Sequence, residues 1–107
     1  MVATAKSEAA EIKRFGGTPQ PNSGRGKHNK GDAIIDKFVV DVKEYGRSFG
    51  LSIPMWAKIC TDAIKQGKRP ALNVVLGEGP KRVRMWVISE SDMMEYLEFL
   101  EERDDSG

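Results

Sequence analysis

The spacing of apolar residues predicts a helix at the start of the chain. Residues 3–15 repeat apolar side chains at helical intervals, and a Gly-Gly pair directly afterwards is typical of a helix end. Glu8 falls within the apolar stripe, where an unpaired carboxylate is costly to bury. The apolar members of that stripe are Ala5, Ile12 and Phe15.

The next apolar pattern, within residues 32–43, predicts a β-hairpin. Asp36-Lys37 separate two short apolar runs and fit a two-residue turn. Antiparallel pairing around that turn sets Asp32 opposite Asp41. The pairs between the turn and these acids are 35 with 38, 34 with 39, and 33 with 40.

The middle of the chain predicts a helix between strands. Residues 48–51 suit a short additional strand, and Pro54 suits the first turn of a helix that ends at Gly67. Residues 71–76 are almost continuously apolar, which is typical of a strand buried on both faces after a helical crossover. The expected apolar face of the helix comprises Met55, Trp56, Ile59, Cys60, Ala63 and Ile64.

The last segments predict a strand and a helix. Residues 83–88 form the strand, after a Gly- and Pro-containing turn. Ser89 or Ser91 caps an acidic helix over 90–102, and a disordered tail is expected over 103–107. The side chains expected to face inward are Met93, Tyr96, Leu97 and Leu100.

Together these segments predict one α/β (mixed α+β) domain spanning residues 1–107. A central mixed sheet of four to five strands is flanked by helices. The chain contains no internal repeat. Its length of 107 residues suits one modest core.

Charge divides the chain more sharply than the net value of +1 indicates. Residues 1–89 carry 16 Lys and Arg against 8 acids, a net +8, whereas residues 90–107 carry one Arg against 8 acids, a net −7. A basic body favours a polyanionic partner. The alternative is a solvated acidic helix on a neutral protein. A single cysteine and the lack of a membrane-length apolar run favour the cytoplasm.

The predicted hairpin carries the candidate chemistry. Like charges opposed across a hairpin, as at Asp32 and Asp41, destabilise it unless a cation lies between them. Lys43 shares their face because side chains alternate along a strand. Two carboxylates with a neighbouring lysine indicate a metal-dependent nuclease.

These features resemble the PD-(D/E)xK nuclease superfamily, with its restriction-endonuclease-like fold. The likeness is closest to archaeal and phage-type Holliday junction resolvases and covers residues 6–76. A glycine replaces the usual proline before the first acid, and the second acid is aspartate where glutamate is commoner. The matching residues are Glu8, Gly16-Gly17, Pro21-Asn22-Ser23-Gly24, Gly31-Asp32 and Asp41-Val42-Lys43.

The resemblance implies a role for each site residue. Asp32, Asp41 and the Val42 carbonyl would bind Mg²⁺, with Mn²⁺ as a substitute. Glu8 would contact that metal directly or through water, or hold a second one. Lys43 would orient or deprotonate the attacking water.

Two alternatives remain for the first helix. Glu8 can instead form a surface salt bridge with Lys6 or Lys13. Glu11, about 60° round a helix of 3.6 residues per turn, is then the fallback ligand.

A glycine-rich basic loop over residues 17–31 suits contact with the DNA backbone. A merely solvated loop is the alternative, and a zinc or catalytic role for its histidine is disfavoured. Two residues after the second strand are expected to touch DNA or a partner subunit. The expected DNA-binding residues are Ser23, Arg25, Lys27, His28, Lys30, Arg47 and Ser48.

The resulting functional prediction is a Mg²⁺-dependent, structure-selective DNA endonuclease. It would resolve Holliday junctions by paired nicks as a homodimer, in a bacterial, archaeal or phage-infected cell. The alternatives are another nuclease or nickase of replication or repair, a non-catalytic DNA-binding module, and an interaction protein acting through its acidic helix.

Overall fold

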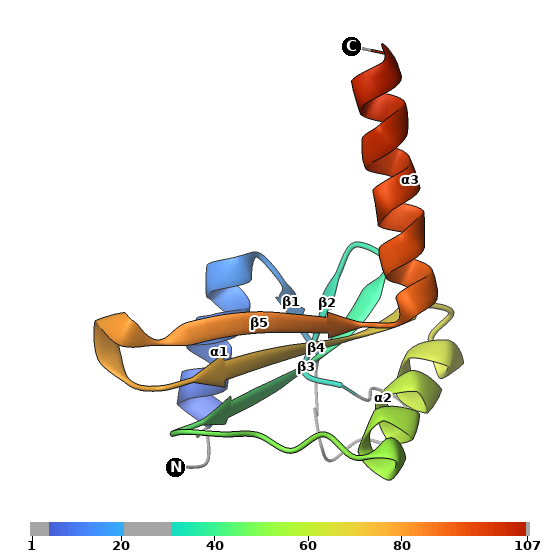
Figure 1. Cartoon of the computed structure of the whole chain (residues 1–107). Coiled ribbons are helices and arrows are strands. Elements are labelled where there is room, and N and C mark those ends of the chain that lie inside the picture. The colour runs from blue at the N-terminus through green and yellow to red at the C-terminus, as the bar shows by residue number, and fades with distance from the viewer. Residues whose placement is uncertain (1–4, 21–30, 107) are drawn as a thin grey trace.

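The protein forms a five-stranded mixed sheet with strand order β1-β2-β3-β4-β5 (Figure 1). The computed structural model describes residues 5–20 and 31–106. β3 and β4 are parallel, and the other neighbouring strands are antiparallel. The elements are α1 (Ala5–Phe15), β1 (Thr18–Pro19), β2 (Ala33–Ile35), β3 (Phe38–Tyr45), α2 (Ile53–Lys65), β4 (Arg69–Leu76), η1 (Gly79–Lys81), β5 (Val83–Ile88) and α3 (Glu90–Ser106).

The predicted hairpin register is confirmed between the turn and the acids. Ile35 pairs with Phe38, Ile34 with Val39, and Ala33 with Val40. Asp36 adopts a positive φ of 51° in the turn, a conformation that aspartate tolerates better than most residues.

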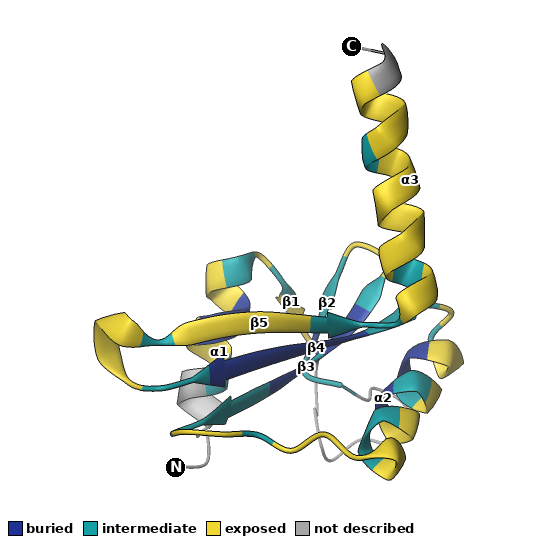
Figure 2. Ribbon diagram, viewed as in Figure 1, coloured by how far each residue is buried: buried dark blue, intermediate teal, exposed yellow. Residues whose placement is uncertain are grey.

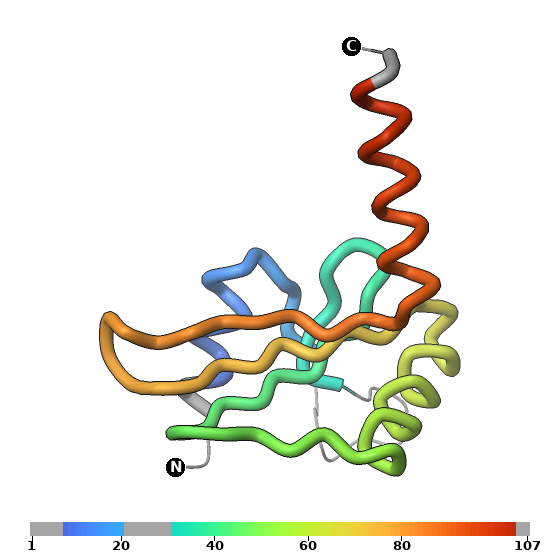
Figure 3. The backbone as a smooth tube through the Cα atoms, viewed as in Figure 1, coloured from blue at the N-terminus to red at the C-terminus, as the bar shows by residue number. Residues whose placement is uncertain are grey.

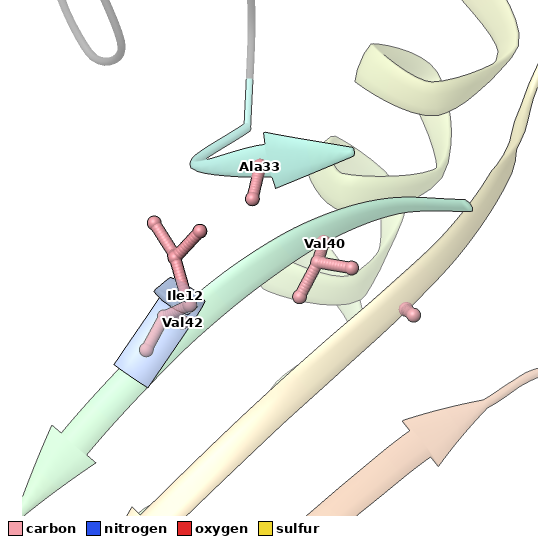
Figure 4. Close-up of a cluster of buried hydrophobic side chains, with 5 residues drawn as sticks. Ile12, Ala33, Val40 and Val42 are labelled. Atoms are coloured by element: carbon pink, nitrogen blue, oxygen red, sulfur yellow. The ribbon is translucent and has the colours of Figure 1, made fainter. Parts of the chain in front are cut away.

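α1 and α2 pack on opposite faces of the sheet. Ile12 of α1 packs in one buried cluster with side chains of β2, β3 and β4 (Figure 4). Ile59 of α2 packs with Leu72 and Val74 of β4 in a second cluster. Because successive strand residues point to opposite faces, each of the two central strands supplies side chains to both helix layers.

β4 is the most buried strand, as its sequence predicted. Every residue from Ala71 to Val75 is buried (Figure 2). The chain reaches β4 from β3 through α2, so the parallel pair is joined by a helical crossover (Figure 3).

α2 begins where its capping residues predict. The Ser52 side chain accepts a hydrogen bond from the Met55 amide at 3.3 Å, with Pro54 in the first turn. The predicted apolar face is wrong at Ile64, which is 71% exposed, because the helix turns this residue away from the sheet.

Two predictions in the irregular segments are wrong. Residues 48–51 form no strand, because the chain leaves the sheet there to enter α2. Phe49 instead packs on Tyr45, with ring centroids 5.2 Å apart. The loop expected over 17–31 contains the two-residue strand β1, held to β2 by backbone pairing that its sequence does not signal.

The prediction for α3 is correct at its start and wrong along its length. The Ser89 side chain accepts from the Asp92 amide at 3.2 Å, as a capping serine should. The helix extends to Ser106, through most of the expected tail, and projects away from the sheet. Met93, Tyr96 and Leu97 are exposed, because no element of the described chain lies over them.

α3 is not a membrane span. Within residues 5–20 and 31–106, no helix combines the length and apolar character needed to cross a bilayer.

Candidate functional site

The hairpin ends at Asp32 in an arrangement that differs from simple strand pairing. Ala33 and Val40 form the last pair of the ladder. The Asp32 amide donates to the Val40 carbonyl at 2.9 Å, and the Val42 amide donates to the Asp32 carboxylate at 2.7 Å. The Asp32 side chain thus replaces a main-chain acceptor and is fixed beside β3.

This replacement leaves a main-chain oxygen on the same edge of β3 as the carboxylate. In a strand, the N–H and C=O of one residue point to the same edge. Because the Val42 amide points at Asp32, the Val42 carbonyl lies on that edge too. The sequence-predicted oxygen ligands Asp32 and Val42 therefore share one edge of β3.

A cavity of about 280 Å³ brings three of the predicted site residues together. Asp32, Asp41 and Lys43 lie in its wall, while Val40 and Val42 point into the opposite core. This confirms the predicted alternation along β3. The remaining wall comes from Gly31, Val39, Met55, Lys58, Ile59 and Asp62.

Asp41 is strongly perturbed by its surroundings. Desolvation by burial, then the hydrogen bond with Asp32 and the charge of that carboxylate, raise the pKa of Asp41 to about 7. Two carboxyl groups that share a proton behave in this way, because both resist ionising side by side. The pair is therefore suited to exchange its shared proton for a cation near neutral pH.

Lys43 is held against Asp41. Its Nζ lies 3.2 Å from the Asp41 carboxylate. Burial lowers the pKa of Lys43, but the charge and hydrogen bond of Asp41 outweigh burial and raise the pKa above its ordinary value. Lys43 is accordingly an ammonium ion at neutral pH, suited to orienting a water or neutralising a phosphate rather than to removing a proton.

Glu8 lies close enough to the hairpin acids to respond to them. Burial and then the charge of Asp32 raise the pKa of Glu8, while Lys43 lowers it. Among the described residues, however, no three His, Cys, Asp or Glu side chains are grouped closely enough to hold one metal ion.

Glu11, the fallback ligand, has a structural role instead. Its buried carboxylate accepts hydrogen bonds from Arg84 at 2.8 Å and Arg14 at 3.1 Å. Burial raises the pKa of Glu11, but these two guanidinium groups together lower it below its ordinary value. The pairing attaches α1 to β5, 73 residues away in sequence.

The glycine before the first acid has a geometric reason. Gly31 has a φ of +87°, which proline cannot adopt because its ring fixes φ near −65°. A Cβ at this position would also collide with a methyl group of Val39. The departure from the usual proline is therefore required by the path of this chain into β2.

The predicted DNA-binding residues are divided by the structure. Arg47 and Ser48 are exposed and line a separate depression with Tyr45, Gly46 and Glu78, outside the acidic cavity. The loop residues lie outside the described part of the chain: Ser23, Arg25, Lys27, His28 and Lys30.

Asp62 of α2 is a cavity residue that the sequence did not reveal. Its carboxylate lies 3.8 Å from Nζ of Lys58, one helical turn earlier. The i,i+4 spacing predicts that these two residues share a face, but only the fold shows that this face meets β3.

No protein-family model, curated protein or solved structure matches this chain.

Proposed function

We propose that this protein is a Mg²⁺-dependent DNA endonuclease of the PD-(D/E)xK type, with a restriction-endonuclease-like fold. The observation that carries the proposal is the joint placement of Asp32, Asp41 and Lys43 in one cavity beside the Val42 carbonyl edge. Such an oxygen-lined edge with a fixed ammonium group suits phosphodiester hydrolysis.

The donor set fits Mg²⁺. Asp32, Asp41 and the Val42 carbonyl offer hard oxygen ligands, and Mg²⁺ commonly binds through one or two carboxylates while retaining waters. Mn²⁺ accepts the same ligands. Bound there, the ion would supply Lewis-acid polarisation of a phosphate and a water of lowered pKa. Glu8 would hold one of the retained waters.

The chain's own groups complete the site. Lys43, kept protonated by Asp41, would orient the attacking water and offset the negative charge of the phosphate. The Val42 amide fixes the orientation of Asp32, and the ion pair with Lys43 fixes that of Asp41.

DNA is the substrate class favoured by charge. Residues 1–89 carry a net +8, which suits a phosphate backbone. By the resemblance, the substrate is a four-way junction, cut by paired nicks in recombination or repair. A homodimer would place two cavities about a two-fold axis. The proposed compartment is the cytoplasm.

The test is cleavage of a labelled four-way junction beside a matched linear duplex, with Mg²⁺ or EDTA. Asp41→Asn and Lys43→Ala are the site variants, and Lys65→Ala, an exposed residue of α2, is the matched control. We expect paired nicks on the junction that EDTA and both site variants abolish and that Lys65→Ala leaves intact.

The other outcomes separate the alternatives. Equal cleavage of both substrates would retain a nuclease but overturn junction selectivity. Tight, salt-dependent binding without cleavage in Mg²⁺ or Mn²⁺ would indicate a DNA-binding module. Absence of salt-dependent DNA binding would exclude both the nuclease and the DNA-binding module, and would favour an interaction protein.

A further inference from the structure

Helix α2 supplies one wall of the acidic cavity. Asp41 lies in register beside Leu72 of β4, and paired residues of neighbouring strands point to the same face of the sheet. Leu72 packs against Ile59 of α2 on that face. Side chains from the first turns of α2 therefore lie over the carboxylates and line the cavity with them.

Lys58 places a second positive charge in this wall. It comes one residue before the buried Ile59, about 100° round the helix, and so lies where the packed face meets solvent. Lys58 lines the cavity although its side chain is 76% exposed. A long cationic side chain commonly lies in this way, with its methylene groups on the protein and its charge in water. Its ammonium group is therefore accessible to a ligand that enters the cavity.

Asp62 holds Lys58 beside the cavity. The side chain of Asp62 is only 13% exposed, and its carboxylate lies 3.8 Å from Nζ of Lys58. An exposed i,i+4 ion pair contributes little to stability, and lysine placed before its acid is the weaker of the two orders. The pair therefore keeps the lysine near the cavity while leaving its charge able to bind a phosphate.

The cavity thus has two ammonium groups on two different elements. Lys43 of β3 is paired with Asp41 beside the carboxylates, and Lys58 of α2 lies at the exposed rim. A DNA strand carries a negative charge on every phosphate, so a strand with one phosphate at the carboxylates brings the next one close by. Contacts with backbone phosphates fix the register of a protein on DNA, and lysine is a common donor in them. Two cations on separate elements match two successive phosphates of one strand.

We propose that Lys58 forms a second phosphate subsite at the rim of the cavity, for the DNA phosphate next to the one that is cut. Lys58 is a substrate-binding residue that takes no part in bond cleavage, and Asp62 orients it. The subsite rests on the proposed function for the identity of the scissile phosphate. Its first test measures DNA binding without cleavage, so that failure of the subsite is distinguishable from failure of the nuclease.

The first test is fluorescence anisotropy of a labelled four-way junction in Mg²⁺, at salt concentrations from about 50 to 200 mM. All proteins carry Lys43→Ala, which keeps the DNA intact. Adding Lys58→Ala should weaken binding about three- to tenfold at the lowest salt. It should also reduce the slope of log affinity against log salt by about one, because one phosphate contact is lost. Lys58→Arg keeps the charge and should keep most of the affinity.

Lys65→Ala is the matched control for this binding test. It removes the same charge from the same side of α2, about 10 Å further along the helix and outside the cavity wall. We expect it to leave the affinity and the salt slope nearly unchanged.

Cleavage kinetics supply a second readout. In the chain that retains Lys43, Lys58→Ala should raise KM about three- to tenfold and change kcat by less than about twofold. This split is expected because the contact with a flanking phosphate is equally strong in the ground state and the transition state. A variant that merely failed to fold would instead lose kcat, since fewer molecules would be active.

Unchanged affinity and salt slope in Lys58→Ala would overturn the subsite. So would an equal loss in Lys65→Ala, which would assign the effect to overall charge. Cleavage by the wild-type chain would retain the nuclease in both cases. Conversely, a Lys58-dependent salt slope on DNA that the wild type does not cut would overturn the nuclease and retain the phosphate contact, whereas absence of DNA binding would overturn both.

Discussion

β4 and α3 both carry apolar residues that the sequence predicts to be buried, but the two elements have opposite surroundings in the structure. β4 is covered on both faces, by α1 and α2, and lies between β3 and β5. α3 exposes Met93, Tyr96 and Leu97 to solvent. The difference shows that a hydrophobic pattern predicts which residues favour burial. It does not predict whether another element of the same chain packs over them.

The same contrast applies to the charged groups of the two regions. Asp41 and Lys43 are held on β3 by its pairing with β4 and by each other. Asp92 and Glu95 are held only near the base of α3, by a partly exposed arginine. A fixed, desolvated pair can perform chemistry, whereas an exposed pair contributes little.

The largest expected effect on stability is at the centre of β4. Leu72→Ala should lower the free energy of unfolding by about 2–5 kcal/mol, because a fully buried side chain leaves a cavity between the sheet and α2. Urea denaturation measures the change through its midpoint. A loss below about 1 kcal/mol would show that α2 is not firmly packed on this face.

Most of this buried region was predictable from sequence. The hairpin register followed from a two-residue turn between apolar runs, and β4 followed from its continuous apolar composition. The joint placement of Asp32, Asp41 and Lys43 followed in turn, because strand alternation is a local rule. These features depend on neighbours a few residues apart.

The features that escaped prediction depend on distant partners. Glu11 is held by Arg84, and Asp62 meets the cavity only because α2 crosses β3. The exposure of Leu97 likewise depends on where α3 leaves the sheet. No local pattern encodes these contacts, because each is fixed by the path of the chain between remote elements.

The second effect is a pH dependence carried by Asp41. The pKa of Asp41 is about 7 in the fold, against an ordinary value of 3.8, so the folded state binds this proton more tightly than the unfolded state. The contribution of Asp41 to stability should therefore be fully present below about pH 4 and fall by about 1–3 kcal/mol as pH rises to about 7. Denaturation in EDTA across this range measures the loss.

Asp41→Asn is the matched variant for this pH effect, because the amide keeps the shape of the side chain but cannot ionise. Its stability should change less with pH over the same window. An equal fall in the stability of the wild type and of Asp41→Asn would assign the pH dependence to another group. Addition of Mg²⁺ should reverse the wild-type loss at the alkaline end, because the cation replaces the proton.

A smaller effect is expected at the ion pair between α1 and β5. Glu11→Gln should lower the free energy of unfolding by about 1–3 kcal/mol, because it weakens a buried, charge-assisted contact. Thermal unfolding measures the change. Glu95→Gln, an exposed partner of Arg69, is the control and should alter the melting temperature far less. Equal shifts would contradict the contrast between the two regions.

The smallest effect is expected on α3. At a dilution that keeps the chain monomeric, Leu97→Ala should change the free energy of unfolding by less than about 0.5 kcal/mol, because Leu97 is 42% exposed. The Leu72→Ala loss arises within one copy and should persist at every dilution. Unfolding of both variants over the same concentration series makes the comparison directly, and a large Leu97→Ala loss at high dilution would mean that α3 is packed on its own chain.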